Sequence, residues 1–184
     1  MLAWLDEMHA AQRPAVIFAY ALGKAERLLA ELHAARFDRA VYVHGSLVPP
    51  IDAYRASGVA LPAVARAADT PRGTDFAGAL VVAPVSARGS TWMRRFGDHG
   101  AAFASGWMRV RGNRRRRGYD RGFVLSDHAD WAELLTTIAD TGATKVLATH
   151  GYKDVLARAC RETGLAAEVL ATEFTGETDE GEGT

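Results

Sequence analysis

The sequence predicts an α/β protein built on a parallel sheet. Along most of the 184 residues, apolar stretches typical of buried strands alternate with amphipathic stretches of helical period. Several of the apolar stretches end in glycine, serine or alanine, which suit the turn between a strand and a helix. Because 48% of the residues are hydrophobic, the chain can also bury a sizeable core.

In the first half, helices are expected where apolar residues recur every three or four positions, and strands where they run together. In order, the expected elements are a helix at 2–9, a strand at 15–20, a helix at 22–37, a strand at 41–46, a helix at 48–58, a polar connection at 61–74 and a strand at 78–87. Pro49 and Pro50 fit the first turn of the helix at 48–58, where a backbone N–H has no helical partner.

The second half continues the alternation. In order, the expected elements are a helix at 89–98, a strand at 101–110, a polar connection at 112–122, a strand and its exit at 122–130, a helix at 130–142, a strand at 144–151, a helix at 152–164 and a strand at 166–174. Ser90 or Thr91 is the expected start of the helix at 89–98. The tail at 175–184 is rich in glycine, acid and threonine, and we expect it to be disordered.

Composition limits the class of protein. The formal net charge is zero, so only a local cluster of charge could attract a polyanion. The single cysteine, Cys160, excludes an intrachain disulfide and fits a small buried residue in a reducing cytoplasm. No apolar run is long enough to span a membrane, and the amino terminus lacks the pattern of a signal peptide. We therefore expect a soluble cytoplasmic protein without a membrane partner.

Small or hydroxylic residues follow several predicted strands. In open parallel sheets, ligands bind beyond the carboxyl ends of the strands, and small residues there let a phosphate approach backbone N–H groups. The residues expected to bind phosphate in these loops are Ser86, Arg88, Ser90, Ser105 and Gly106. The alternative for each loop is a simple tight turn. Neither GxGxxG nor GxxxxGK[ST] occurs, so the sequence does not support a nucleotide cofactor site of the usual kind.

Two histidines carry the sharpest candidate chemistry. His128 and His150 each follow a predicted strand, where an imidazole can ligate a metal or transfer a proton. Two histidines do not complete a catalytic zinc site, which usually has three protein ligands, and the nearby Asp127 and Asp130 could equally be a helix cap and a surface acid. The alternative for His128 is a strand-to-helix turn. The remaining histidines are weaker candidates: His9, His33, His44 and His99.

Seven arginines lie close together with a single acid, Asp120, among them. They are Arg109, Arg111, Arg114, Arg115, Arg116, Arg117 and Arg121. Such a run can neutralise nucleic-acid phosphates without reading sequence, and its alternative is a solvated loop. Nearby Trp92, Trp107 and Tyr119 could stack on unpaired bases. A tryptophan in an apolar strand such as that of Trp107 is, however, more typical of a core.

Taken in order, several stretches resemble one family. FAYALGKAERLL, VYVHGS, VVAPVSARGSTWMRRF, FASGWM, FVLSDHADW and VLATHG resemble the carboxyl-terminal half of the beta-CASP nucleases of the metallo-β-lactamase superfamily. Within that group, the chain looks most like the bacterial ligase-associated DNA exonucleases, also described as mRNA 3′-end processing factor homologues. The resemblance covers about residues 15–174. It implies a Rossmann-like beta-CASP domain at 1–108, the final βαβαβ part of a metallo-β-lactamase domain at 109–174, and an acidic tail at 175–184.

The resemblance also implies an activity. Such proteins are metal-dependent exonucleases, here expected to act on DNA with RNA as an alternative, in which the beta-CASP segment forms a lid that grips the nucleic-acid backbone over two zinc ions. Manganese is the alternative metal. By the resemblance, His128 contacts the scissile phosphate and protonates the leaving oxygen, and His150 ligates zinc.

The chain also departs from the family. The HxHxDH signature, the later metal-binding histidine, the bridging aspartate and the acidic motif before the beta-CASP segment do not occur in it. We therefore expect a carboxyl-terminal fragment that binds metal weakly and does not hydrolyse nucleic acid alone. Its expected partners are DNA or RNA, the missing amino-terminal half, a DNA ligase or a helicase. The alternatives are a catalytically inactive binding module and, less favoured, a small Rossmann-like nucleotide-binding protein.

Overall fold

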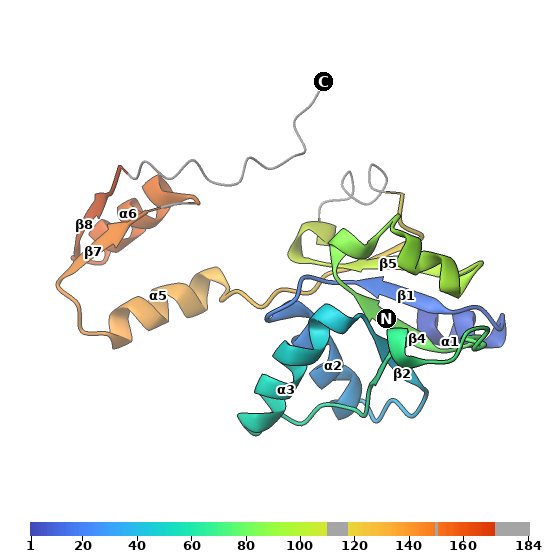
Figure 1. The fold of residues 1–184 in the computed structure, drawn as a ribbon. Helices are drawn as coiled ribbons and strands as arrows, with labels where there is room; N and C mark the ends of the chain where they lie inside the picture. The colour runs from blue at the N-terminus through green and yellow to red at the C-terminus, as the bar shows by residue number, and fades with distance from the viewer. Residues whose placement is uncertain (110–117, 150, 172–184) are drawn as a thin grey trace. The chain divides into compact units, whose positions relative to one another are not determined.

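The computed structural model describes residues 1–109, 118–149 and 151–171, and the chain forms two compact units (Figure 1). The first unit is Met1–Asp127, and the second begins at His128. This division falls later than the boundary expected after residue 108, because a strand at Arg121–Phe123 belongs to the sheet of the first unit. Which named domains the two units correspond to stays a prediction.

The first unit is built on a six-stranded sheet in which every neighbouring pair is parallel. The strand order is β3-β2-β4-β1-β5-β6. The strands are β1 (Ala15–Phe18), β2 (Val41–Val43), β3 (Ala65–Arg66), β4 (Leu80–Ala83), β5 (Gly100–Ala104) and β6 (Arg121–Phe123). The α/β class and the parallel sheet are thus confirmed. Strand β3 lies in the stretch predicted to be a polar connection.

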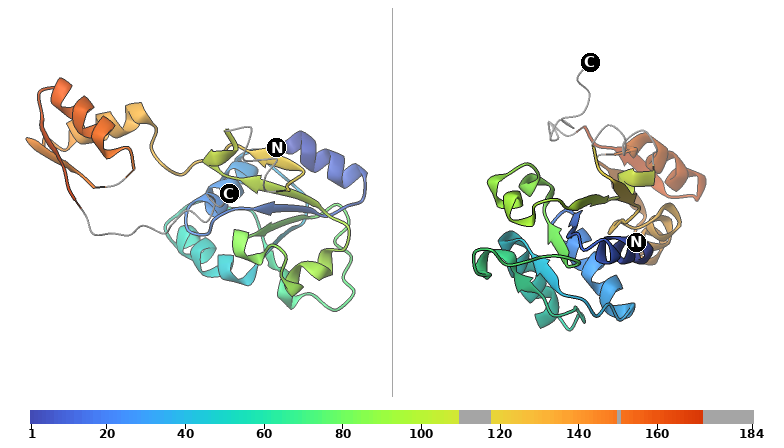
Figure 2. Two further views of the ribbon diagram at one scale, coloured as in Figure 1. Left: turned by 90° about the horizontal axis from the view of Figure 1, so that it is seen from above. Right: turned by 90° about the vertical axis from the view of Figure 1, so that its right-hand side faces the viewer.

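Alternate residues of the central strands point to opposite faces, and each face has its own core. Helices α1 (Leu2–Ala10), α2 (Lys24–Ala34) and α3 (Val48–Ala56) pack on the face that carries Ile17 and Val82. The right-hand view of Figure 2 shows α1 and α2 on one side of this sheet. All three helices agree with the predicted ones. In α2, leucines at helical spacing form a continuous buried stripe.

The opposite face is covered by short 3₁₀ helices instead of α-helices. They are η2 (Ala67–Asp69), η3 (Val85–Ala87), η4 (Thr91–Phe96) and η5 (Gly106–Arg109). The helix predicted at 89–98 is present as η4, a 3₁₀ helix that begins at Thr91, one of the two predicted starts. The Ser90 hydroxyl donates to Ala87 O (2.7 Å) and does not cap the helix. Aromatic rings fill the layer between η4 and the sheet, where Phe76 packs edge-on against Tyr42 and Phe96.

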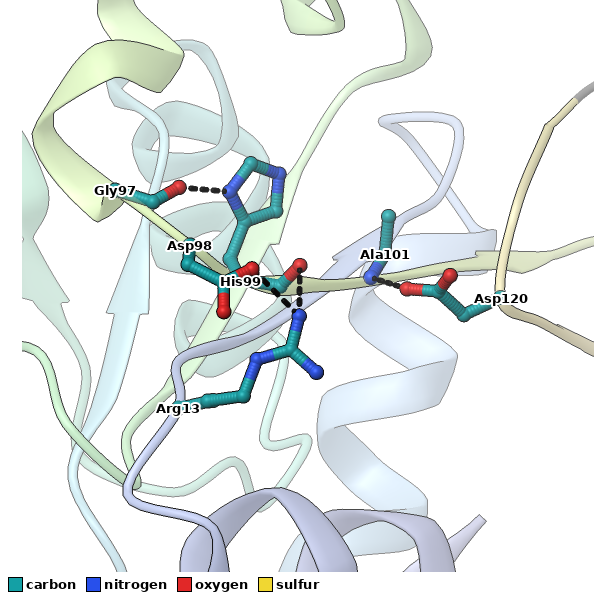
Figure 3. Close-up of polar contacts among 6 residues, drawn as sticks. All are labelled: Arg13, Gly97, Asp98, His99, Ala101 and Asp120. Atoms are coloured by element: carbon teal, nitrogen blue, oxygen red, sulfur yellow. Dashed lines mark hydrogen bonds and ion pairs between the residues drawn. The ribbon is translucent and has the colours of Figure 1, made fainter.

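A polar network fixes the amino ends of β1, β5 and β6 (Figure 3). The Ala101 N–H donates to Asp120 Oδ2 (2.8 Å), and the Asp120 N–H donates to Ala101 O (2.9 Å). Arg13, just before β1, pairs with Asp98 (2.7 Å) and donates to His99 O (3.2 Å). Asp120, the one acid among the clustered arginines, therefore joins β6 to β5.

The second unit is smaller. Strands β7 (Lys145–Ala148) and β8 (Ala166–Val169) are parallel, and α6 (Lys153–Glu162) packs against them. Its buried core consists of Ala148, Ala157, Cys160 and Ala167, so the prediction of a buried cysteine is confirmed. Helix α5 (Trp131–Asp140) starts with a capping box, in which Asp130 Oδ1 accepts the Glu133 N–H (2.8 Å).

Among the described residues, no helix combines the length and apolar character needed to cross a membrane. The tail predicted to be disordered at 175–184 lies outside the described residues.

Candidate functional site

Parallel strands bring the loops that follow them to one edge of the sheet, here called the carboxyl edge. The sequence-predicted phosphate-binding residues all follow β4 or β5 and so belong to this edge: Ser86, Arg88, Ser90, Ser105 and Gly106. Ser86 and Arg88 are exposed, whereas Ser105 is buried. The structure therefore gives these residues a common edge but unequal access to a ligand.

The loops after β5 and β6 lie against each other. The Ser105 N–H donates to Phe123 O (3.0 Å), and a Cβ placed on Gly106 would lie 3.7 Å from the Ser126 Cβ. Ser105 Oγ accepts the N–H of Trp107 (3.4 Å), so this hydroxyl shapes the turn into η5. Gly106 is half-buried and has no side chain to shield its backbone from a ligand.

Arg88 is held in place by an aromatic ring. Its guanidinium lies 4.2 Å from the centre of the Tyr119 ring, and it donates to Gly118 O (3.0 Å). Tyr119 is itself buried and stacks on Phe103 of β5 (ring centres 5.3 Å apart). A planar guanidinium suits such a site because it can stack on a ring and still present N–H donors to a phosphate.

Side chains from the first turn of α2 contact the last residues of the first unit. Lys24 Nζ lies 2.6 Å from Asp127 Oδ1, with side chains that are 13% and 22% exposed. Arg27 donates to Ser126 O. Gly23 has φ of 124°, and a Cβ there would overlap Asp127 Oδ2. Sequence reasoning missed Lys24, because no local pattern pairs it with an aspartate on a distant loop.

The candidate histidines have different outcomes. His128 is exposed and is the first residue of the second unit, bonded directly to Asp127. His150 lies outside the described residues, as do Arg114, Arg115, Arg116 and Arg117. Within the described parts of the chain, no three His, Cys, Asp or Glu side chains are grouped as a metal site requires. The described residues therefore do not fit a zinc site.

His44, a weaker candidate in the sequence, has a defined environment at the end of β2. Its Nδ1 accepts the Ser46 N–H (3.2 Å) and contacts Ser46 Oγ (2.8 Å), and its ring packs edge-on against Trp92 (4.8 Å). Burial lowers the pKa of His44, and the positive charge of Arg66 lowers it further. The imidazole is thus biased toward its neutral form, in which it can donate one hydrogen bond but supplies no charge.

The three predicted stacking residues are not equivalent. Tyr119 is buried and already stacked, and Trp92 is partly buried against His44 and Phe96. Trp107, which the sequence indicated as a core residue, is 55% exposed at the start of η5. Its neighbour Met108 enters the core instead.

Comparison with known proteins relates the chain to part of a longer protein. No family model matches the chain. The chain is 33% identical over 155 residues to a protein of Opitutus terrae named "Probable DNA ligase". The aligned stretch covers 83% of this chain and 14% of that protein. The similarity therefore relates the chain to a small part of a much longer protein.

Proposed function

We propose that this chain is the lid and substrate-grip portion of a metal-dependent exonuclease that hydrolyses phosphodiester bonds in DNA, with RNA as the alternative substrate. The observation that carries the proposal is the carboxyl edge of the parallel sheet, where exposed Arg88 and half-buried Gly106 lie in the loops after β4 and β5, the two strands that flank β1. The similarity to a protein whose name is that of a DNA-processing enzyme also supports a role on DNA.

In this proposal, the nucleic-acid backbone lies across the carboxyl edge. Arg88, held over Tyr119, neutralises a phosphate, and the open backbone at Gly106 permits a second phosphate to approach closely. These contacts read charge and shape without reading sequence. Residues Arg114, Arg115, Arg116 and Arg117 are proposed to add further phosphate contacts.

His128 is the proposed proton donor to the leaving oxygen. It is bonded to Asp127, whose carboxylate is held by Lys24 and lies against Gly23. A general acid must be placed within hydrogen-bond reach of its target, and this pair fixes the backbone immediately before His128.

Zinc, with manganese as the alternative, is proposed for the complete enzyme only. His150 is the one proposed ligand from this chain, and further ligands would come from other parts of the enzyme. Because the described residues do not fit a zinc site, no step of the reaction is assigned to a metal held by them.

A catalytically inactive nucleic-acid-binding module, associated with a DNA ligase or helicase, is the second candidate. The observation that favours it is the similarity of this chain to 14% of a longer protein named "Probable DNA ligase". Such a module would keep the carboxyl edge as its binding surface and leave the chemistry to its partner.

The test compares digestion and binding of 5′-labelled single-stranded DNA. This chain and a version extended upstream of Met1 are assayed with zinc or manganese, each with and without His128→Ala and His150→Ala. Digestion by the extended form alone, lost with either substitution, would support the exonuclease. An inert extended form, combined with salt-sensitive DNA binding by the chain, would support the binding module. If neither form binds nor digests nucleic acid, both candidates are wrong.

A further inference from the structure

Three large apolar side chains are exposed where β1 and β5 end. Tyr20 is 47% exposed and Leu22 74%, both just after β1, and Trp107 is 55% exposed just after β5. The two strands are neighbours in the sheet (Figure 1). Phe18, the last residue of β1, lies opposite Phe103. Tyr20 and Trp107 therefore lie just after two neighbouring strands, at the carboxyl edge of the sheet. Large apolar side chains exposed at one edge of a sheet are candidates for a binding surface.

The exposure of Trp107 is fixed by its backbone. The N–H of Trp107 is bonded to Ser105 Oγ (3.4 Å) and that of Met108 to Ser105 O (3.0 Å), so the turn has a set direction. Met108 is buried in the core on the face of the sheet that the 3₁₀ helices cover. The turn therefore directs Met108 inward and leaves the indole of Trp107 outside.

Tyr20 is also held in position. Its ring packs edge-on against Phe103, with ring centres 6.0 Å apart, and Lys24 Nζ lies 5.7 Å from the ring centre. Lys24 is in turn fixed by its ion pair with Asp127. Half of the tyrosine surface stays open to solvent although its orientation is set, which is the condition for a pre-formed stacking surface.

The backbone of Leu22 has an unusual conformation. Its φ is 62°, in the left-handed region that leucine disfavours, and Gly23 follows with φ of 124°. Such conformations persist where the surroundings impose them and are common at ligand-binding sites. Here, the Gly23 N–H is bonded to Glu26 Oε2 (2.7 Å), which holds the turn and keeps Leu22 outside.

The charge near this surface indicates the occupant. Arg88 follows β4, and Arg109 ends η5 two residues after Trp107; both are exposed. A protein partner would need only the apolar part of the surface, whereas unpaired nucleic acid offers flat bases to the rings and phosphates to the arginines. Paired bases are stacked inside a duplex, so a duplex could not use the rings.

We propose that Tyr20 and Trp107, flanked by Leu22, form a stacking surface for unpaired bases and thereby make the carboxyl edge selective for single strands. This inference rests on the proposed function in one respect, namely that nucleic acid binds at the carboxyl edge. It adds the state of the substrate and assigns Tyr20 and Leu22 to the site.

Binding by the full chain is measured by fluorescence anisotropy without divalent metal. The probes are labelled oligothymidylate of about ten nucleotides, an abasic strand of the same length, and a hairpin duplex. The variants are Tyr20→Ala, Trp107→Ala and the ring-conserving Tyr20→Phe. Trp131→Ala is the matched control, because Trp131 is also exposed (46%) but belongs to the second unit. Circular dichroism verifies that each variant folds.

We expect the wild type to prefer oligothymidylate over the abasic strand and the duplex. Tyr20→Ala and Trp107→Ala should each weaken binding of oligothymidylate by about tenfold, as loss of one stacked base does. Neither should change binding of the abasic strand. Tyr20→Phe and Trp131→Ala should behave as the wild type.

The contrary outcomes separate this inference from the proposed function. Unchanged affinity of both alanine variants for oligothymidylate, or an equal loss on the abasic strand, would overturn stacking while leaving nucleic-acid binding intact. Absence of binding by the wild type would overturn both. A dimer seen by sedimentation that Trp107→Ala dissociates would instead show that a second copy covers the surface, and stacking would again be wrong.

Discussion

Lys24 and Asp127 meet at 2.6 Å and join the start of α2 to the last residue of the first unit. Both side chains are largely shielded from water, at 13% and 22% exposed. The pair therefore fixes the point from which the chain leaves the sheet toward His128.

Breaking this pair should lower the stability of the first unit. In Lys24→Met, the Asp127 carboxylate stays partly buried without its cation, and we expect a loss of about 1–3 kcal/mol in the free energy of unfolding. Urea unfolding followed by circular dichroism measures it. Asp52→Ala is the control, because the pair of Asp52 with Arg55 is longer (3.6 Å) and more exposed, and its loss should cost at most about 0.5 kcal/mol. Equal losses in the two variants would contradict the expectation.

Gly23→Ala should destabilise the protein more than an equivalent change elsewhere. The alanine Cβ would overlap Asp127 Oδ2, and the alanine would have to adopt a φ of 124°, so we expect a loss of about 2 kcal/mol or more in the free energy of unfolding. Gly58→Ala is the matched control, since Gly58 also has a positive φ (86°) but open space around its Cβ position. Its cost should stay near about 1 kcal/mol. Thermal melting of both variants would expose the difference, and similar melting temperatures would argue against the overlap.

Asp120→Ala should loosen the junction of β5 and β6. The Ala101 N–H would lose its acceptor, and we expect a cost of about 1–2 kcal/mol together with faster hydrogen exchange at that amide. Asp120→Asn keeps a side-chain oxygen and should retain most of the protection. Asp98→Ala, at a carboxylate that is 82% exposed, should change stability little. Unchanged exchange at Ala101 in Asp120→Ala would refute this role.

His44 should make the protein less stable as the pH falls. Because its pKa is lowered in the folded state, the unfolded chain takes up a proton at His44 more readily than the folded chain does. The folded protein keeps the full contribution of neutral His44 to its stability at pH values above the ordinary histidine pKa of about 6.5. This contribution is lost as the pH falls from there through the lower pKa that His44 has in the folded protein. NMR titration should show His44 protonating below that value, and Arg66→Ala should move its pKa upward. A wild-type His44 that titrates at the ordinary value would contradict this prediction.

Arg88→Ala should weaken DNA binding in a way that depends on salt. If Arg88 neutralises one phosphate, its loss should reduce the slope of log affinity against log salt by about one, whatever the DNA sequence. The measurement is a salt titration of single-stranded DNA binding. Arg158→Ala, at an exposed arginine of the second unit, serves as the control. An unaltered slope for Arg88→Ala would exclude Arg88 from the phosphate contacts.

Most of the architecture could be predicted from local patterns. The run of buried residues in β1 and the leucine stripe of α2 are determined by their own sequence, because each must bury an apolar surface. Strand β3 escaped prediction because it has only two residues, both exposed, and pairs through its backbone alone. The side chains of the segment around Trp92 pack as an aromatic layer on the sheet, and its local pattern does not distinguish a 3₁₀ helix from an α-helix.

The candidate site was less accessible to sequence reasoning. The glycine and serine residues at strand ends lie at one edge of the sheet, since parallel strands place such loops together, and ligand binding at this edge stays a prediction. The partners of Asp127 and the exposure of Trp107 depend on contacts between distant segments and on the direction of one turn. Tyr20 gave no signal, because an aromatic residue at the end of an apolar strand is ordinarily read as core.

The burial of Cys160 allows the opening of the second unit to be followed by thiol labelling. It is the only cysteine in the sequence and is 1% exposed within the small core of the second unit. A thiol reagent in solution can reach this sulfur only when that core opens, so the labelling rate reports the opening of the second unit. Unfolding of the first unit, followed in parallel through its own spectroscopic signals, can thus be timed separately in a single unmodified protein.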